Sequence, residues 1–482
     1  MSSASSTPSA QRPSAQRPSG AAAAPDLLDL PDPPPLRTMV GPGVVAVGIG
    51  MAAGEIILWP YLTSVGGLGL LWLAVVTLAI QTVINLEIER YTLATGQTVV
   101  AGFSRWSRVW GILICLAGAF QYVWPGWATS GSTVLTYLTG GGDVVWITVG
   151  SLVGFGVVLT VSPVVYRTIE KVELVKVVLT LFFLAVVAVA VIGWHTWSTA
   201  GEKTVTGAGR IPDGITFTMI LSAIGAAGAG GVHNLVLSNW IRDKGYGMGA
   251  HVPKLVSPIT GQSEASGADR YTFPQDEANL ARWRVWWRRA NTEHIVSFFV
   301  VCLVSIGLMS MLAYETLFGR DDVENSPAFL RIQGDLLGQQ VGDWLKILFF
   351  AVATVSLWAA SIGLLDIIGR VVSDFARRNY LRESAFWTEG RLYVAVIWAE
   401  VGIGSAILLS GVDQPIVLLT ISTCTASVVT LVYSALLIRL NRRDLPGAVR
   451  LRGPRLFGML LAIGFYGFFA LAMLKSQLEE NF

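Results

Sequence analysis

The chain has 482 residues, of which 53% are apolar and only 14% are charged. Soluble domains carry about a quarter of charged residues, so this composition predicts an integral membrane protein. The formal net charge of +2 comes from basic residues dispersed along the chain. That dispersal gives no indication of a nucleic-acid partner, and none is expected. The expected partner is the lipid bilayer, and the sequence shows no obligatory protein partner.

Residues 1–36 form a separate low-complexity segment. The pentapeptide Pro-Ser-Ala-Gln-Arg occurs at 8–12 and again at 13–17, and an acidic, proline-rich stretch ends at Pro35. The segment lacks the apolar core that a signal peptide needs. It is therefore predicted to be a disordered cytoplasmic tail.

The rest of the chain has the pattern of membrane-spanning helices. A span needs roughly 20 mostly apolar residues, and about eleven segments meet that criterion. They lie near 38–63, 67–94, 109–138, 144–163, 170–194, 213–242, 292–316, 343–374, 391–411, 414–439 and 454–475. The predicted fold class is an all-α polytopic membrane protein, with a helical core at 37–440 and one extra helix within 441–482.

Basic residues concentrate in alternate loops, which sets the expected orientation. One set of loops is rich in arginine, with three between 377 and 382, whereas the other set holds few basic residues, such as Lys203 and Arg320. This predicts a plasma-membrane protein with its N-terminus in the cytoplasm and its C-terminus outside. The longest inner loop, 243–291, ends in a basic, tryptophan-rich stretch at 278–290, which predicts a helix lying on the membrane surface.

Two glycine-rich interruptions occur in matching spans of two halves, about 38–194 and 213–439. The first interruption is 48–55 in span one, and the second is 225–234 in span six. Two halves with an odd number of helices insert with opposite topology, which is the inverted-repeat plan of many secondary transporters. Closely spaced glycines also let helices pack closely. The seven consecutive small residues 225–231, however, favour an unwound segment that lines a substrate site.

Each interruption carries a titratable residue. Glu55 is the candidate ligand, because a carboxylate at membrane depth is costly and typically functional; the alternative is that it caps the half-helix that follows. His233 is either a proton acceptor near Glu55 or a buried histidine bonded to a carbonyl group. Asn234 is expected to be a hydrogen bonder between helices or part of the pathway.

Four further polar residues are candidates for the pathway or for coupling. Gln121 is the most polar large side chain of the third span. Ser422 and Thr423 of the tenth span either offer hydroxyl groups to the site or bond back to their own helix. Glu400 in the ninth span is either a coupling residue or the partner of a basic group on another helix.

No nucleotide-binding loop, nucleophile motif or His/Cys metal spacing occurs in the sequence. The chain is therefore not expected to be an enzyme, and no cofactor is expected. Transport powered by ATP would need a partner, so secondary transport is the favoured function.

Several separated motifs carry a family resemblance. In chain order they are Gly41-Pro42-Gly43, Leu70-Leu71-Trp72, the run from Glu87 to Gly96, the run from Ile169 to Val172, and His233-Asn234-Leu235. Over roughly 38–440 they resemble the Nramp family of divalent-metal transporters. The resemblance implies a five-plus-five inverted repeat of the LeuT/APC type, with helices one and six broken around the ion.

The residues that bind metal in that family are altered here. The family's Asp and Asn of the first break fall on Ala52 and Glu55, and its Met of the sixth span falls on Gly231. The family's His survives as His233. Losing the thioether removes a soft ligand and leaves more room, and a roomy site with one carboxylate suits Mg²⁺, which keeps several waters. The chain therefore looks most similar to the Nramp-related magnesium transporters.

The resemblance implies Mg²⁺ or Mn²⁺ as transported substrate. Glu55 would be the metal ligand, with backbone groups near Ala52, Gly54 and Gly228 completing the site. The third span lacks Asp and Glu between 113 and 137, which predicts transport without proton coupling. Two alternatives are a transporter of a small organic solute on the same fold, and a sensor or scaffold that transports nothing.

Overall fold

The computed structural model describes residues 26–39, 41–162, 165–252, 255, 270–324, 326–412 and 414–481. Nine helices in this part of the chain are long and apolar enough to cross a membrane. The predicted all-α polytopic membrane protein is therefore confirmed. The sequence indicated eleven spans. The number is lower in the structure because the first and sixth spans are each divided into two short helices. In addition, the second half of the first span continues directly into the second span.

The two divided spans lie side by side within the bundle. The first consists of α1 (Pro42–Gly50), the π-helical turn η2 (Gly54–Leu58) and α2 (Trp59–Gly66). The sixth consists of α10 (Phe217–Ala226) and α11 (Val232–Lys244). Helix α1 contacts α11, and η2 contacts α10. Broken helices one and six, as expected for the predicted fold class, are thus present.

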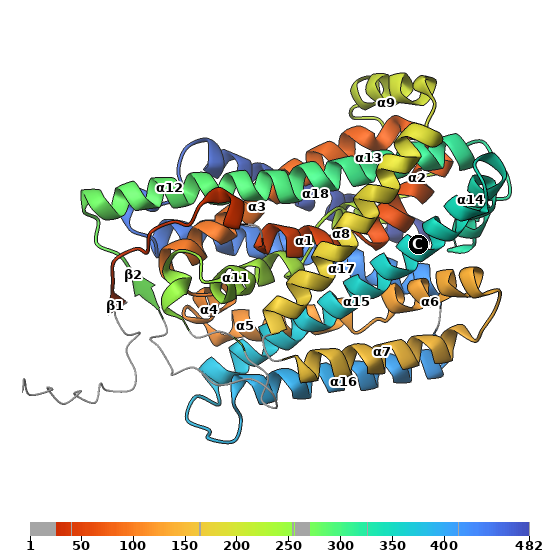
Figure 1. The fold of residues 1–482 in the computed structure, drawn as a ribbon. Helices are drawn as coiled ribbons and strands as arrows, with labels where there is room; N and C mark the ends of the chain where they lie inside the picture. The colour runs from red at the N-terminus through yellow and green to blue at the C-terminus, as the bar shows by residue number, and fades with distance from the viewer. Residues whose placement is uncertain are drawn as a thin grey trace, which may run out of the picture.

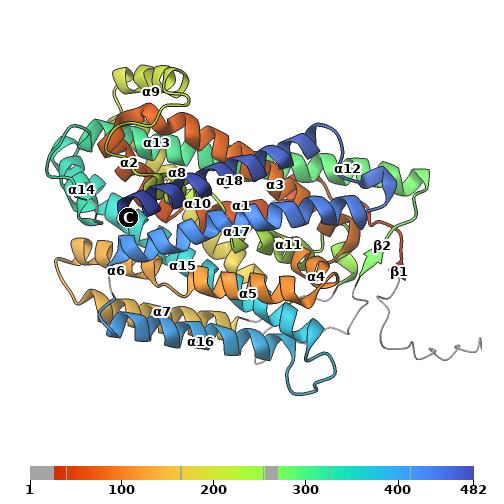
Figure 2. The ribbon, with the colours of Figure 1, turned by 180° about the vertical axis from the view of Figure 1, so that it is seen from behind.

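Long helices from both halves of the sequence surround the divided pair. They are α3 (Leu71–Thr95), α8 (Val165–Ala190), α13 (Val301–Leu317), α15 (Asp343–Asn379) and α17 (Pro415–Arg443). Outside them lie α5 (Arg108–Tyr122), α6 (Gly126–Thr139), α7 (Val144–Val161) and α16 (Glu389–Leu409). Figure 1 shows α7 and α16 side by side at the edge of the bundle. The extra helix α18 (Pro454–Asn481) packs along α17 and α3 (Figure 2).

Short elements close the two ends of the bundle. They are η1 (Leu36–Thr38), η3 (Gly67–Leu70), α4 (Val99–Ser104), α9 (Trp194–Thr206), η4 (Gly247–His251), α14 (Ala328–Gln340) and η6 (Gly447–Val449). Figure 1 shows α9 and α14 at one end, and β1 (Asp26–Leu27) and β2 (Tyr271–Thr272) at the opposite end, where α12 begins. We call this opposite end the α12 end.

Helix α12 (Glu277–His294) continues through the π-helical turn η5 (Ile295–Val300) into α13. The expectation that 278–290 lies along the membrane surface is therefore wrong, because the stretch extends the seventh span beyond the bundle. Asp276 starts the helix by accepting a hydrogen bond from the backbone N of Asn279 at 2.8 Å, and no proline interrupts it before its end. Hydrogen bonds from the Asn279 backbone and side chain also lower the pKa of Asp276.

The last part of the predicted disordered tail has a defined place. Residues 1–25 lie outside the described part of the chain, but 26–39, which we call the N-terminal strap, run along α12. Strand β1 pairs in parallel with β2. The strap then contacts α12 through Leu30 to Asn279, Pro31 to Trp286, Asp32 to Arg282, and Pro33 and Pro34 to Arg289. Composition suggested disorder here, whereas α12 supplies the donors that these proline carbonyl groups otherwise lack.

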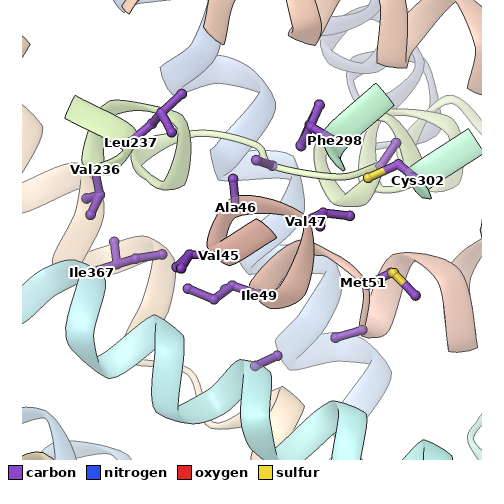
Figure 3. Close-up of a cluster of buried hydrophobic side chains, with 14 of the residues drawn as sticks. Val45, Ala46, Val47, Ile49, Met51, Val236, Leu237, Phe298, Cys302 and Ile367 are labelled. Carbon is purple, nitrogen blue, oxygen red and sulfur yellow. The ribbon is translucent and has the colours of Figure 1, made fainter. Parts of the chain in front are cut away.

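Apolar packing fixes α1 inside the bundle. Figure 3 shows the α1 side chains surrounded by side chains of α11, η5, α13 and α15, among them Val236, Phe298, Cys302 and Ile367. All of these residues are buried. Close contact of this kind, rather than transfer out of water, stabilises helices against one another within a bilayer.

Candidate functional site

The two interruptions face each other at close range. The first follows Gly50 and ends at Gly54, and the second lies between Ala226 and Val232. A Cβ atom on Gly50 would overlap the carbonyl group of Gly228, and one on Gly54 would overlap the carbonyl oxygen of Ala226. Only glycine allows two backbones to approach this closely, so the glycine-rich sequence is required by the contact itself.

A small cavity lies between the interruptions, with room for about one water molecule. Its wall comes from α1, α5, α6, α10, α11, α15 and α17. The polar and aromatic side chains of the wall are Gln121, Tyr122, Trp127, His233 and Thr423. The rest of the wall is aliphatic side chains and glycine-rich backbone, and no carboxylate belongs to it among the described residues.

Glu55 is buried in η2, only 1% exposed, beside the first interruption. Its Oε2 accepts a hydrogen bond from the backbone N of Ala52 at 3.1 Å, which is the capping arrangement. Its Oε1 has no hydrogen-bond partner in the described part of the chain. The carbonyl oxygen of Ala52 already accepts from the backbone N of Ile56 at 2.8 Å, so it belongs to the helix that follows.

Lys176 of α8 brings a second buried charge to the first interruption. Its Nζ donates a hydrogen bond to the carbonyl oxygen of Gly48, near the end of α1, and lies 3.5 Å from Glu173 Oε2. The C-terminal end of a helix carries partial negative charge, so the ammonium group caps α1. Lys176 also interacts electrostatically with Glu55. The interruption therefore holds two acidic side chains and one basic side chain.

Side chains from α3 and α17 satisfy part of the second interruption. Gln81 of α3 donates from Nε2 to the carbonyl oxygen of Ile224 at 3.3 Å and accepts from the backbone N of Ala229 at 3.0 Å. The Thr430 hydroxyl of α17 accepts from the backbone N of Gly231 at 2.9 Å. Unwound backbone inside a membrane needs such partners, and these side chains supply them.

Gln121 of α5 forms hydrogen bonds with the backbone on the other side of this interruption. Its amide donates to the carbonyl oxygen of Gly230 at 3.3 Å and accepts from the backbone N of Val232 at 3.2 Å. The Tyr122 hydroxyl donates to the same Gly230 carbonyl at 3.2 Å. A Cβ atom on Gly231 would overlap the Gln121 amide. The room expected from the Met-to-Gly change is therefore filled by Gln121.

His233 and Thr423 lie in the cavity wall. The His233 ring packs edge-on against Trp240, with the ring centroids 5.6 Å apart, and its Nε2 has no hydrogen-bond partner among the described residues. The Thr423 hydroxyl lies 2.6 Å from the Ser222 hydroxyl and donates to the Leu419 carbonyl at 2.8 Å. Thr423 thus faces the cavity while bonding back to its own helix.

Three candidate residues are buried elsewhere. Glu400 lies on α16, which packs against α7 and α15 in the outer layer, and neither carboxylate oxygen has a hydrogen-bond partner in the described part. Ser422 and Asn234 are buried next to wall residues without belonging to the wall. The structure therefore brings together Glu55, Gly54, Gly228, Gln121, His233 and Thr423 around the two interruptions.

Sequence reasoning missed Lys176, Glu173 and Gln81. Each is a polar or charged side chain inside an otherwise apolar span, and each is buried. A charge at membrane depth usually has a function, so this signal was available. Which carbonyl group each side chain would contact could not be read from the sequence, because that depends on how α3 and α8 pack against the broken helices.

Comparisons with known proteins bear on the fold. No family model matches the sequence, and no curated protein matches it. Among solved structures, the manganese transporter of Eremococcus coleocola bound to an aromatic bis-isothiourea substituted compound superposes with a TM-score of 0.67 at 13% identity. That match covers 94% of this chain and 90% of that chain.

A second solved structure resembles the chain along most of its length. Mhp1, a nucleobase-cation-symport-1 family transporter with bromovinylhydantoin bound, gives a TM-score of 0.54 at 13% identity. The match covers 91% of this chain and 93% of Mhp1. Likeness at this identity shows the fold alone. The fold is that of the LeuT-type membrane transporters, with two broken helices facing each other, and the chain is a multi-pass integral membrane protein.

Proposed function

We propose that the chain is a secondary transporter that moves a small solute by alternating access. The solute binds in the cavity between the two interruptions. The observation that carries this proposal is the contact of the two glycine-rich breaks around a cavity whose wall includes unwound backbone. Such backbone is kept at membrane depth where it lines a binding site.

The chemistry of the wall favours a small organic solute over a bare metal ion, and the two broken helices must move apart to admit one, because the cavity has room for about one water molecule. Tyr122 and Trp127 offer aromatic surface, and Gln121, His233 and Thr423 offer a few polar groups. This mixture is typical of small-molecule sites. The Lys176 side chain interacts electrostatically with Glu55, so a divalent cation at Glu55 would have to compete with that partner.

A divalent cation, Mg²⁺ or Mn²⁺, is the second candidate. It is favoured by the free Oε1 of Glu55, which is buried and without a partner in the described part of the chain. The similarity to a manganese transporter and the resemblance to the Nramp motifs point the same way. In this case Glu55 is the metal ligand. Backbone groups near Gly54 and Gly228 complete the ion site, and His233 is a neighbouring side chain.

Screening of the purified protein separates the candidates. Small organic solutes, Mg²⁺, Mn²⁺ and Ca²⁺ are ranked by how far they raise the unfolding temperature, and hits are tested for uptake into proteoliposomes. An organic solute is expected to be taken up, with at least tenfold loss in Trp127→Ala and no loss in Trp146→Ala, whose side chain on α7 is 63% exposed.

Two results would change this conclusion. Influx of Mg²⁺ or Mn²⁺ that Glu55→Gln abolishes would assign the cation instead, because glutamine keeps an acceptor for the backbone N of Ala52 but removes the charge. Absence of any uptake in proteoliposomes that retain folded protein would reject a transporter and favour a sensor or scaffold.

A further inference from the structure

A second group of potential ligands lies away from the central cavity. Glu89 of α3 and Glu293 and His294 of α12 bring their side-chain donor atoms within 4.8 Å of one another. His294 Nδ1 is 3.1 Å from Glu89 Oε1. All three residues are buried, with exposed fractions of 3%, 8% and 0%. The group lies where α12 ends and passes into η5, packed against α3 and next to the start of α1.

The polar atoms of this group are poorly satisfied. Glu89 Oε2 and both ring nitrogens of His294 lack hydrogen-bond partners among the described residues, although Nδ1 is so close to Glu89. Glu293 Oε1 accepts a hydrogen bond from the Ser297 hydroxyl at 3.1 Å. Glu89 Oε1 and His294 Nδ1 thus lie close together without forming a hydrogen bond. Two ligands of one metal ion would be arranged in the same way.

Among the described residues, the basic group paired with these carboxylates is His294, which balances Glu89 only when its imidazole is protonated. Within the described part of the chain, neither Glu89 nor Glu293 forms an ion pair with lysine or arginine. The nearby basic side chains are engaged elsewhere, since Arg90 and Arg455 pair with Glu87. Two buried carboxylates side by side repel each other, and a bound cation would remove that cost.

The spacing fits one small metal ion. Carboxylate and imidazole donors bind first-row divalent metals at about 2.0–2.2 Å, so neighbouring donors around one ion stand roughly 3–4 Å apart. Distances up to 4.8 Å need only small side-chain movements. A narrow crevice lined by Pro42, Tyr246, Glu89 and Glu293 among others adjoins the group, and it has no room for a water molecule, so an ion there would be held by the side chains themselves.

We propose that Glu89, Glu293 and His294 form a second divalent-cation site that joins α3 to α12. Two carboxylates and one imidazole suit a first-row transition metal such as Mn²⁺, Co²⁺ or Zn²⁺. A Cβ atom on Gly43 would lie 2.8 Å from Glu293 Oε1, so the first turn of α1 packs directly on a ligand. A bound ion would therefore hold the beginning of the broken helix, whatever solute the central cavity binds.

Metal titration of the purified, tag-free full-length protein tests the proposal. Co²⁺ binding is followed by visible absorption, and Zn²⁺ binding by calorimetry. One ion is expected to bind wild type and Glu55→Gln equally. Glu89→Gln and His294→Gln should bind at least tenfold more weakly. The matched control is Glu315→Gln, which removes a carboxylate near the C-terminal end of the same continuous helix, away from the group, and should bind normally.

Three outcomes would overturn the proposal. They are no binding to wild type, binding that Glu89→Gln and His294→Gln leave unchanged, and binding that Glu55→Gln abolishes. The last result places the ion in the central cavity and instead supports the cation candidate for transport. If the variants do not fold, X-ray absorption of the wild-type Co²⁺ complex must show mixed oxygen and imidazole ligation. A spectrum without imidazole would likewise reject the site.

Discussion

Lys176 and Glu55 show how individual side chains replace the hydrogen bonds that a broken helix loses. The Lys176 ammonium group bonds to a carbonyl group near the end of α1, and Glu55 bonds to a backbone N–H at the start of the next half-helix. Each charge matches the partial charge of the helix end that it contacts. The capping alternative for Glu55 therefore describes its geometry, and its free oxygen remains for a ligand.

Replacing Lys176 should be costly. In Lys176→Met the buried Glu173 carboxylate and the Gly48 carbonyl group lose their partner. Breaking a buried ion pair by removing one member typically costs about 3–5 kcal/mol, and we expect a loss of that size in the free energy of unfolding. The measurement is thermal or denaturant unfolding in detergent. Lys171→Met, on the exposed side of the same helix, is the control and should change stability little. Equal stability of the two variants would contradict this role of Lys176.

At the scale of elements, the two interruptions contact each other closely, as the regular helices α10 and α17 do at Gly225. Glycine pairs such as Gly50 with Gly228 are what allow the contact between the interruptions. The positions of both interruptions were predictable, because glycine weakens a helix and a run of glycines inside an apolar span therefore favours unwound backbone. Their mutual contact was expected only through the repeat, and the side chains that hold it, such as Gln81, depend on tertiary packing.

Adding one methyl group at this contact should destabilise the protein. In Gly54→Ala the new Cβ atom would overlap backbone atoms of Ala226, which cannot move aside as a flexible side chain could. Overpacking of this kind typically costs about 1–3 kcal/mol. Gly307→Ala on α13 is the matched control, since a Cβ atom there meets no heavy atom within 4 Å. Unfolding of the two variants gives the comparison, and a stable Gly54→Ala protein would argue against the contact.

The N-terminal strap depends on the arginine and tryptophan side chains of α12. Arg289 donates hydrogen bonds to the carbonyl oxygens of Pro33 and Pro34, whereas the neighbouring Arg288 is exposed. We expect Arg289→Ala to loosen the strap and Arg288→Ala to leave it in place. Hydrogen–deuterium exchange of peptides from 26–39 measures this. Equal exchange in the two variants would show that these bonds do not hold the strap.

At the scale of the whole molecule, a network of buried ion pairs joins the broken sixth span to α15 near the α12 end. Arg370 pairs with Asp243 of α11 and, at 2.7 Å, with Asp366 of its own helix. Arg242 of α11 pairs with Asp374 of α15 at 2.9 Å. Alternating access requires one helix group to move against another, and in this proposal these pairs must separate or move together.

The predicted orientation can be tested on intact cells. With the N-terminus inside, a cysteine in Glu479→Cys near the end of α18 should react with a membrane-impermeant maleimide from outside. One in Glu383→Cys, in the exposed turn between α15 and α16, should react only after the membrane is opened. Wild type supplies the background of Cys115, Cys302 and Cys424, which are buried or half-buried. The reverse labelling pattern would invert the assigned topology.

The arrangement of the membrane-spanning helices was more predictable than the position of α12 and of residues 26–36. Apolar runs and glycine interruptions indicated eleven spans, with the first and sixth broken, because bilayer thickness and backbone satisfaction constrain sequence strongly. The same rules say nothing about parts outside the bilayer. There α12 proved to be an extension of the seventh span, and residues 26–36 proved to be attached to it. Long-range hydrogen bonds of this kind leave no local pattern.

The strap also bears on how the N-terminus can be shortened. Removing residues 1–25 leaves every contact between 26–39 and α12 in place. Removing residues 1–40 also removes the strap that contacts Trp286 and so exposes this side chain. An aromatic face exposed in this way invites self-association in detergent. Versions of the protein made for biochemistry should therefore retain Asp26, even though composition alone would mark the whole leading stretch as dispensable.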